Sequence, residues 1–136
     1  MPTDTPATAT SVARRFYDAL AGADAEALLT LLADDFEGLV SAGMPHGVGG
    51  PHHGAQDMLG VWATIDEAYD ISVEPSEYLT VSDQRVVVLG HYRGRSKADN
   101  AAVDAAFAHV IDAEGDRMTG LHQITDTVSW RIPVPN

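Results

Sequence analysis

The hydrophobic pattern of this 136-residue chain changes its period once, at Asp70. Before this point apolar residues recur three and four positions apart, as on one face of a helix, and after it they alternate with polar residues, as along a strand. Three helices followed by four strands predict an α+β domain. In such a domain the helices pack on one face of a curved antiparallel sheet.

The helical part divides into two segments before the Gly-rich middle of the chain and one after it. Residues 11–38 predict two amphipathic helices separated at "AGAD", where Asp24 can cap the second helix because its carboxylate accepts free amide hydrogens of the first turn. Residues 55–69 predict the third helix. Residues 1–10, rich in Thr, Pro and Ala, predict a disordered tail, and residues 11–136 a single domain.

The strand part contains four segments with a period of two, residues 70–82, 85–96, 101–112 and 117–130. Turn residues separate them in "SDQ", "SKADN" and "DAEGD", where Gly115 can take a positive φ. The four segments are therefore expected to be consecutive antiparallel strands.

The charge and the absence of cysteine exclude several classes of function. Eight Lys and Arg residues stand against twenty Asp and Glu residues, a formal net charge of -12 that would repel nucleic acid and anionic membrane surfaces. With no cysteine, the chain has no disulfide, no thiolate nucleophile and no cysteine-based zinc site. The sequence has no membrane span and no secretion signal, so a cytoplasmic protein is expected.

Three stretches together carry a resemblance to a known family: "FYDALAGADAEALLTLLADDFE", "RVVVLGHYRGRS" and "FAHVIDAEGDRMTGLHQITDT". They resemble the SnoaL-like polyketide cyclase group of the nuclear transport factor 2-like (NTF2-like, ketosteroid isomerase-like) superfamily, over residues 11 to about 130. The resemblance implies a cone-shaped α+β barrel with a cavity between sheet and helices, and a homodimer formed through the outer face of the sheet. Activity differs among such relatives, because function belongs to sites and not to folds.

Catalytic groups of characterised relatives are missing at the matching positions. The resemblance puts Phe16, Val40 and Ala108 where the steroid isomerases have a tyrosine and two aspartates. The cyclase stretch "HWDxxD" corresponds to "LHQITD", so Gln123 replaces the first acid and Asp126 matches the second. The Asp-Arg-Asp set of the epoxide hydrolases lacks its arginine. Steroid isomerase and epoxide hydrolase activities are therefore not expected.

Strand alternation, aligned through the resemblance, predicts a largely apolar cavity for a small hydrophobic, cyclic or aromatic molecule. The residues expected to line it are Phe16, Val40, Trp62, Val86, Val88, Tyr92, Ala108, Leu121 and Gln123. The same alternation puts Phe107 and His109 on the outer face. Alternatively, the apolar residues only fill a core, and the Gln123 amide bonds a neighbouring strand instead of a ligand. Asp126 has outward parity and would reach the cavity only through a bulge.

The segment "GMPHGVGGPHHG", residues 43–54, is too irregular for a helix or a strand and is expected to be a loop beside the cavity mouth. His46 and His53 adjoin glycine and are candidate proton carriers, because a histidine has an ordinary pKa of about 6.5. His52 is expected to face solvent. A metal site is not expected, because the loop lacks cysteine, an HExxH pair and a clear carboxylate partner. Alternatively, the loop is flexible and has no chemical role.

The expected function is cofactor-free acid/base chemistry on a polyketide-like or terpenoid intermediate, by a cyclase, isomerase or dehydratase. His46 or His53 would move a proton, Gln123 would orient a carbonyl group, and Asp126 would be a second acid. A non-catalytic protein that binds a small hydrophobic ligand is the competing hypothesis. A structural dimerisation domain whose cavity is filled by side chains is the third.

Overall fold

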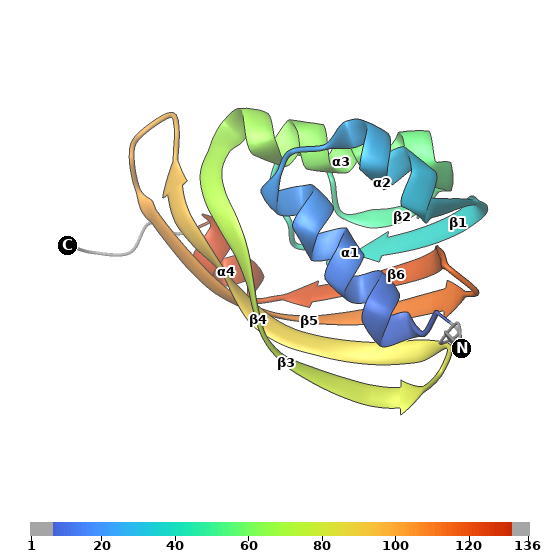
Figure 1. Ribbon diagram of the computed structural model, residues 1–136. Helices are drawn as coiled ribbons and strands as arrows, with labels where there is room; N and C mark the ends of the chain where they lie inside the picture. The colour runs from blue at the N-terminus through green and yellow to red at the C-terminus, as the bar shows by residue number, and fades with distance from the viewer. Residues whose placement is uncertain (1–6, 132–136) are drawn as a thin grey trace.

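The computed structural model describes residues 7–131 and has helices packed on one face of a curved sheet (Figure 1). The elements are α1 (Ala9–Ala21), α2 (Ala25–Leu31), β1 (Leu32–Val40), β2 (Gly50–His53), α3 (Gly54–Ala68), β3 (Tyr69–Ser82), β4 (Arg85–Ser96), β5 (Ala102–Glu114), β6 (Arg117–Thr125) and α4 (Thr127–Arg131). The expected α+β class is confirmed, with the short helix α4 in addition to the three expected helices.

The six strands form one sheet in the order β2-β1-β6-β5-β4-β3. All neighbours are antiparallel except β1 and β6, which are parallel. Strands β1 and β2 were not expected, because Leu28, Leu31 and Leu32 continue the helical spacing up to the first residue of β1. After Asp35 the burial instead follows a period of two, with Phe36, Gly38 and Val40 buried and Glu37 and Leu39 exposed.

Side-chain caps set the starts of α1 and α2. Helix α1 begins after Thr8, whose side chain accepts a hydrogen bond from the Ser11 amide in a capping box, so ordered structure begins before the expected boundary at Ser11. Residues 1–6 of the expected tail lie outside the described residues. Asp24 caps α2 as expected, with the Ala27 amide donating to its carboxylate over 3.0 Å.

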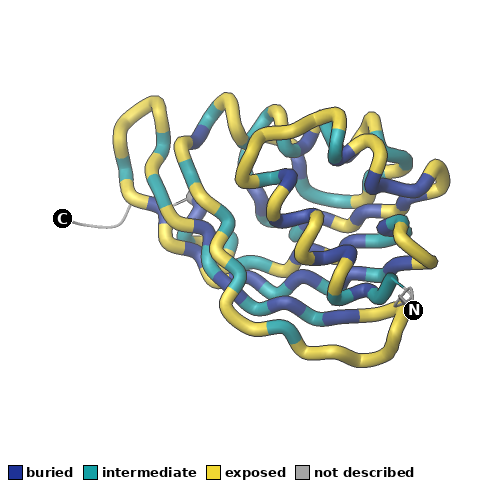
Figure 2. Tube along the Cα trace, viewed as in Figure 1, coloured by how far each residue is buried: buried dark blue, intermediate teal, exposed yellow. Residues whose placement is uncertain are grey.

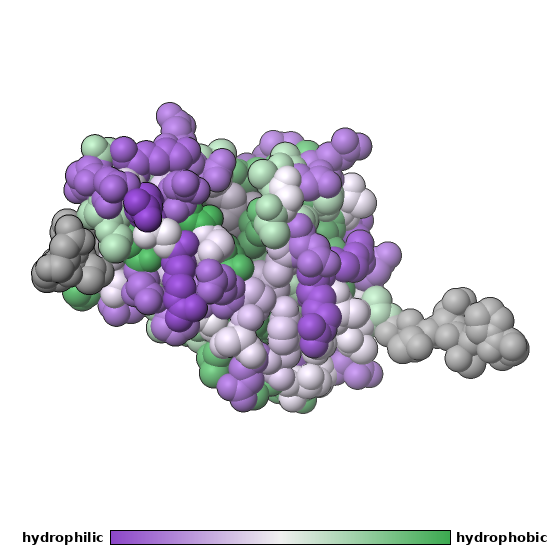
Figure 3. Space-filling model, turned by 60° about the vertical axis from the view of Figure 1, so that its left-hand side comes forward, coloured by the Kyte–Doolittle hydropathy of each residue, from purple (hydrophilic) through white to green (hydrophobic). Residues whose placement is uncertain are grey.

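The core lies between the helices and the concave face of the sheet, where buried residues gather in Figure 2. Figure 3 shows hydrophilic residues over much of the surface, with hydrophobic residues exposed between them. Within residues 7–131, the helices are all too short or too polar to span a membrane.

Gly90 lets β3, β4 and β5 approach closely. A Cβ atom there would lie 2.6 Å from Cζ of Phe107 and 2.9 Å from Cα of Pro75, and would also collide with the carbonyl oxygen of Glu74. The Phe107 ring therefore packs directly on the β4 backbone.

Candidate functional site

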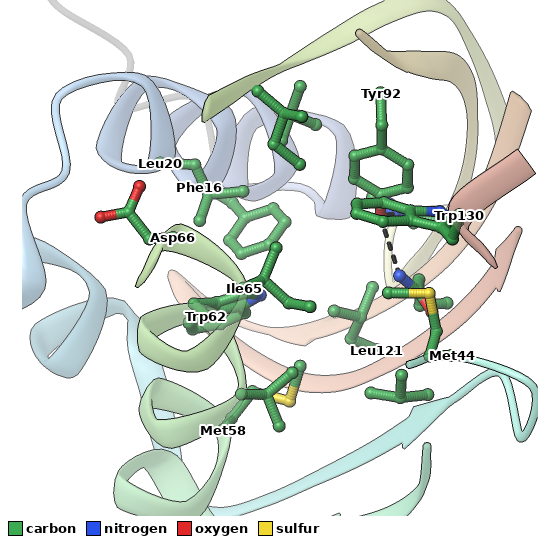
Figure 4. Close-up of a pocket in the computed structure, with 16 residues that line it drawn as sticks. Phe16, Leu20, Met44, Met58, Trp62, Ile65, Asp66, Tyr92, Leu121 and Trp130 are labelled. Carbon is green, nitrogen blue, oxygen red and sulfur yellow. Dashed lines mark hydrogen bonds between the residues drawn. The ribbon is translucent and has the colours of Figure 1, made fainter. Parts of the chain in front are cut away.

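A cavity of about 110 Å³ lies between α1, α3 and the concave face of the sheet. Its lining residues are Phe16, Leu20, Val40, Met44, Met58, Val61, Trp62, Ile65, Asp66, Ile71, Val73, Tyr92, His109, Leu121, Gln123 and Trp130. Figure 4 shows Phe16 and Trp62 on one side and Tyr92 and Trp130 on the other. An engineered apolar cavity of about 150 Å³ binds benzene, so this space suits a molecule of about one ring.

Aromatic rings form much of the cavity wall. The Phe16 and Trp62 ring centroids are 5.4 Å apart, and those of Tyr92 and Trp130 are 5.1 Å apart. Tilted aromatic pairs at such distances pack favourably and leave ring faces and edges for a hydrophobic ligand. Asp66 is the acidic residue of the lining and is exposed; it lies on the side opposite Tyr92 and Trp130, and its carboxylate points away from them (Figure 4).

A chain of hydrogen bonds crosses the sheet side of the cavity. His109 Nδ1 lies 2.8 Å from the Tyr17 hydroxyl, and His109 Nε2 lies 2.6 Å from the Tyr92 hydroxyl. Gln123 Nε2 donates to the same Tyr92 oxygen over 3.1 Å, and the Ser41 amide donates to Gln123 Oε1 over 3.2 Å. The chain thus joins α1, β4, β5, β6 and the residue after β1.

Burial keeps the titratable side chains of this hydrogen-bond chain, those of His109, Tyr92 and Tyr17, neutral. It lowers the pKa of His109 to about 3 and raises the pKa of Tyr92, although the hydrogen bond from Gln123 opposes the rise. Burial also raises the pKa of Tyr17, with further contributions from Tyr92 and Tyr78. The polar patch therefore offers neutral hydrogen-bonding groups and not a fixed charge.

Most of the side chains expected to line the cavity do so. They are Phe16, Val40, Trp62, Tyr92, Leu121 and Gln123, and their contact with a ligand stays a prediction. Val86 and Val88 point inward but are fully buried in the core and do not line the cavity. The Gln123 amide bonds Tyr92 on a neighbouring strand and the Ser41 backbone, and a ligand contact of its other amide hydrogen stays a prediction.

The expected inward position of Ala108 is wrong. In the β4–β5 register Val88 pairs with His109 and Gly90 with Phe107, and directly paired residues point to the same face of a sheet. Phe107 and His109 are therefore inside, and Ala108 is outside. The sequence holds the signal that was missed: apolar residues occupy alternate positions from Val103 to Ala113, and His109 shares their parity.

The histidine loop contains one histidine near the cavity. His46, exposed and with a positive φ of 64°, lies 3.2 Å through Nε2 from the Tyr69 hydroxyl, and the Tyr69 ring packs on Trp130 of the cavity lining. His53 is 72 % exposed and pairs with Glu37, away from the lining residues. The proton-transfer roles of His46 and His53 stay predictions.

His52, expected to face solvent, instead fastens the loop. Its Nδ1 lies 2.9 Å from a carboxylate oxygen of Asp57 and its Nε2 2.7 Å from the Val48 carbonyl oxygen. Because both partners are acceptors, both contacts are hydrogen bonds only when both ring nitrogens donate, that is, when His52 is an imidazolium. Partial burial would lower the pKa of His52, but the hydrogen bonds to Asp57 and Val48 outweigh it and raise the pKa. Residues 50–53 form strand β2, so the expectation that the whole segment is an irregular loop is wrong for these residues.

Asp126 does not reach the cavity. Strand β6 ends at Thr125 without the bulge that would turn Asp126 inward, and Asp126 is exposed. Its carboxylate accepts a hydrogen bond from the Ser129 hydroxyl over 2.8 Å, and its carbonyl oxygen accepts one from the Ser129 amide. The structure gives Asp126 a contact in the first turn of α4. Throughout residues 7–131, no cluster of three or more His, Asp or Glu side chains could hold a metal ion.

The sequence profile of the SnoaL-like domain matches residues 13–121 of this chain. The chain belongs to the SnoaL-like family. The comparison of this chain with curated proteins found no match.

Solved structures extend the fold comparison for this SnoaL-like domain. An NTF2-like protein of unknown function from Burkholderia pseudomallei is 26% identical, with a TM-score of 0.79 over 88% of this chain and 92% of that one. TerC, co-crystallised with polyporic acid, is 22% identical, with a TM-score of 0.80 over 90% of this chain and 94% of TerC. A protein with a ketosteroid isomerase-like fold from Catenulispora acidiphila, in complex with trimethylamine, is 19% identical, with a TM-score of 0.70 over 83% of each chain.

Proposed function

We propose that the cavity binds a small hydrophobic molecule with an oxygen atom and that this domain converts it by cofactor-free acid/base chemistry. One observation carries the proposal: Tyr92, His109 and Gln123 form a single hydrogen-bonded patch on the wall of a largely apolar cavity. A concave apolar site with a few convergent polar groups is the usual form of a small-molecule site. The co-crystal of the structural neighbour TerC with polyporic acid supports a small organic ligand in this fold.

A carbonyl oxygen next to the patch would meet two donors. One is the Tyr92 hydroxyl, and the other is the second amide hydrogen of Gln123, whose first points to Tyr92. Donors that are already in place stabilise the negative charge that develops on a carbonyl oxygen when the neighbouring carbon loses a proton. This proton loss is common to isomerisation, aldol-type cyclisation and dehydration of polyketide-like or terpenoid intermediates.

The base in this proposal is Asp66, which lies at the exposed side of the cavity across from Tyr92, and a rotation of its side chain would turn the carboxylate from solvent toward the ligand. A carboxylate at the exposed side of a pocket can accept a proton from a bound ligand and release it to water. His46 is the histidine of the loop best placed to assist, because it contacts Tyr69 at the edge of the aromatic wall.

The test follows the exchange of the acetophenone methyl hydrogens for deuterium in D₂O by proton NMR. The purified protein should accelerate exchange with saturation, and Tyr92→Phe should slow it about 100-fold, the usual effect of removing one such donor. Asp66→Asn should remove the acceleration. Glu67→Gln, at the neighbouring exposed acid outside the lining, should leave it unchanged. Acceleration that persists in both Tyr92→Phe and Asp66→Asn would overturn these assignments.

The second candidate function is non-catalytic binding of the same kind of ligand. It is favoured by the neutrality of the buried polar groups, since burial lowers the pKa of His109 to about 3 and raises the pKa of Tyr92. Saturable binding of acetophenone without methyl exchange would establish this function instead. Absence of binding would exclude both.

We also propose that the protein is a cytoplasmic homodimer formed through the outer face of the sheet. This face presents apolar side chains whose neighbours along each strand point inward. They are Val87, Leu89, Ala108, Val110 and Ile124. Ile124 is 45% exposed, and covering such a face is favourable because it removes apolar area from water.

A further inference from the structure

The side chains of Tyr17, His109 and Tyr92 form a row of hydrogen bonds, and together they carry more polar hydrogens than the contacts within the row can take up. Each hydroxyl has one hydrogen and a neutral imidazole has one, which makes three hydrogens for two contacts, Tyr17 to Nδ1 and Tyr92 to Nε2. One hydroxyl hydrogen is therefore always left over. If the imidazole hydrogen is on Nδ1, the hydrogen left over belongs to Tyr17, and if it is on Nε2, it belongs to Tyr92.

The other end of the row is fixed. The Ser41 backbone amide can only donate, so the Gln123 atom that it contacts must be the carbonyl oxygen. Gln123 Nε2 then donates to Tyr92 Oη in either arrangement. At this end of the row, the hydrogen of Tyr92 is the one that changes direction, either toward His109 Nε2 or into the cavity.

The two arrangements differ in what they offer to a ligand. Tyr92 and His109 line the cavity, whereas Tyr17 does not. With hydrogen on Nε2, the imidazole donates to Tyr92 and the Tyr92 hydroxyl donates to an acceptor in the cavity. With hydrogen on Nδ1, Tyr92 donates to the imidazole and its oxygen can accept from a ligand N–H or O–H group.

We propose that Tyr17, His109 and Tyr92 form a switch in which the bound ligand sets the tautomer of His109, so that one place on the cavity wall binds both a carbonyl oxygen and a hydroxyl group. The inference rests on the proposed ligand site and names its ligand class, a carbonyl compound together with its enol. The tautomers differ by the transfer of one hydrogen between Nδ1 and Nε2, with no change in net charge.

Tyr17 is a positioning residue in this switch. Its hydroxyl accepts from Nδ1–H in one tautomer and donates to Nδ1 in the other, so both tautomers keep a partner on α1. Without that hydroxyl, the Nδ1–H tautomer would leave a buried donor unpaired and the Nε2–H tautomer a buried acceptor, on a side chain that is 2% exposed.

The experiment uses protein labelled with ¹⁵N-histidine and two small ligands, acetophenone, which can only accept a hydrogen bond, and pyrrole, whose N–H donates. The ¹⁵N shifts of His109 should report Nε2–H in the acetophenone complex and Nδ1–H in the pyrrole complex. In Tyr92→Phe the two complexes should give the same tautomer. The same tautomer in both wild-type complexes would overturn the switch.

Selectivity provides the second readout. Tyr17→Phe should weaken acetophenone binding relative to pyrrole about tenfold, because the acetophenone complex then contains an unpaired buried Nδ1 acceptor. The pyrrole complex contains one unpaired buried donor in either protein, the Tyr17 O–H in the wild type and Nδ1–H in the variant. Tyr78→Phe is the matched control, since the Tyr78 ring packs near Tyr17 but its hydroxyl does not belong to the row of hydrogen bonds. Its ratio of acetophenone to pyrrole affinity should equal that of the wild type. An unchanged ratio in Tyr17→Phe would contradict the role of Tyr17. Failure of both ligands to bind would instead contradict the proposed function.

Discussion

His109 is held inside the domain as a neutral side chain. Its imidazole stacks on Phe107 with ring centroids 3.9 Å apart, and tyrosine hydroxyls contact both ring nitrogens. Burial lowers the pKa of His109 to about 3, whereas a histidine in an unfolded chain has a pKa of about 6.5. Between these two pH values the unfolded chain binds a proton that the folded domain excludes.

This difference predicts a pH dependence of stability. Because the folded pKa is lowered, the contribution of His109 is fully present above about pH 6.5 and is lost as the pH falls toward 3, by up to about 1.4 kcal/mol per pH unit. Urea unfolding between pH 7.5 and 4.5 should show this slope in the wild type and a smaller slope in His109→Gln. His122→Gln, at an exposed histidine, should keep the wild-type slope. Equal slopes in the wild type and His109→Gln would contradict the excluded proton.

At the scale of elements, the close approach of β3, β4 and β5 depends on Gly90. A methyl group in Gly90→Ala would collide with the Phe107 ring and with the β3 backbone at Pro75. We expect a loss of about 1–3 kcal/mol in the free energy of unfolding, as for other overpacked sites. Gly60→Ala in α3 meets no atom within 4 Å and should stabilise the domain by roughly 0.5–1 kcal/mol. Urea denaturation of both variants measures the contrast, and a stable Gly90→Ala protein would show that the sheet can open there.

The histidine loop is a second element with a measurable pH response. Hydrogen bonds to Asp57 and Val48 raise the pKa of His52 in the folded protein. The stabilisation of the loop by His52 is therefore fully present below about pH 6.5 and is lost as the pH rises through the folded pKa. Hydrogen exchange of residues 43–54, corrected for the intrinsic rate, should therefore show stronger protection at pH 6 than at pH 8.5. His52→Asn should remove this difference. The same protection at both pH values in the wild type would refute the imidazolium assignment.

The type of an element could be predicted from the sequence where turn residues flank a segment with a regular hydrophobic period. The four expected strands correspond to β3, β4, β5 and β6, although the last segment runs into α4. Strand β1 was missed because its first leucine continues the spacing of α2 with no Gly or Pro between them. Strand β2 was missed because glycine, proline and histidine are poor strand formers. Its strand geometry comes from pairing with β1, which a local pattern does not contain.

The site was less predictable than the fold, because it depends on which face of β5 is inside. Apolar alternation fixes parity within a strand, but the pairing with β4 decides which parity faces the helices. The family resemblance indicates the opposite parity, which puts Ala108 where His109 lies. Tyr92 and Gln123 were placed correctly, since their strands were aligned on the right face.

At the scale of the whole molecule, the proposed dimer predicts the effect of a charge on the outer face. Ile124→Asp should give a monomer in sedimentation velocity, because an unpaired carboxylate would be buried at the interface. Val128→Asp is the control, as Val128 is 61% exposed on α4 and lies outside the sheet. A dimeric Ile124→Asp protein would show that the copies meet through another surface. A monomeric wild-type protein would show that no dimer forms.

The turn between β4 and β5, residues 97–101, has an evolutionary consequence. It connects two long strands whose register puts His109 beside Val88 and Phe107 beside Gly90. A one-residue slip of β5 past β4 would exchange its two faces, so that Ala106, Ala108 and Val110 turned inward. A point substitution alters one wall residue, but an insertion or deletion in this turn would replace the chemistry of a whole strand. Descendants of this gene with such a length change would retain the barrel but turn His109 from the cavity wall to the outer face in a single mutational event.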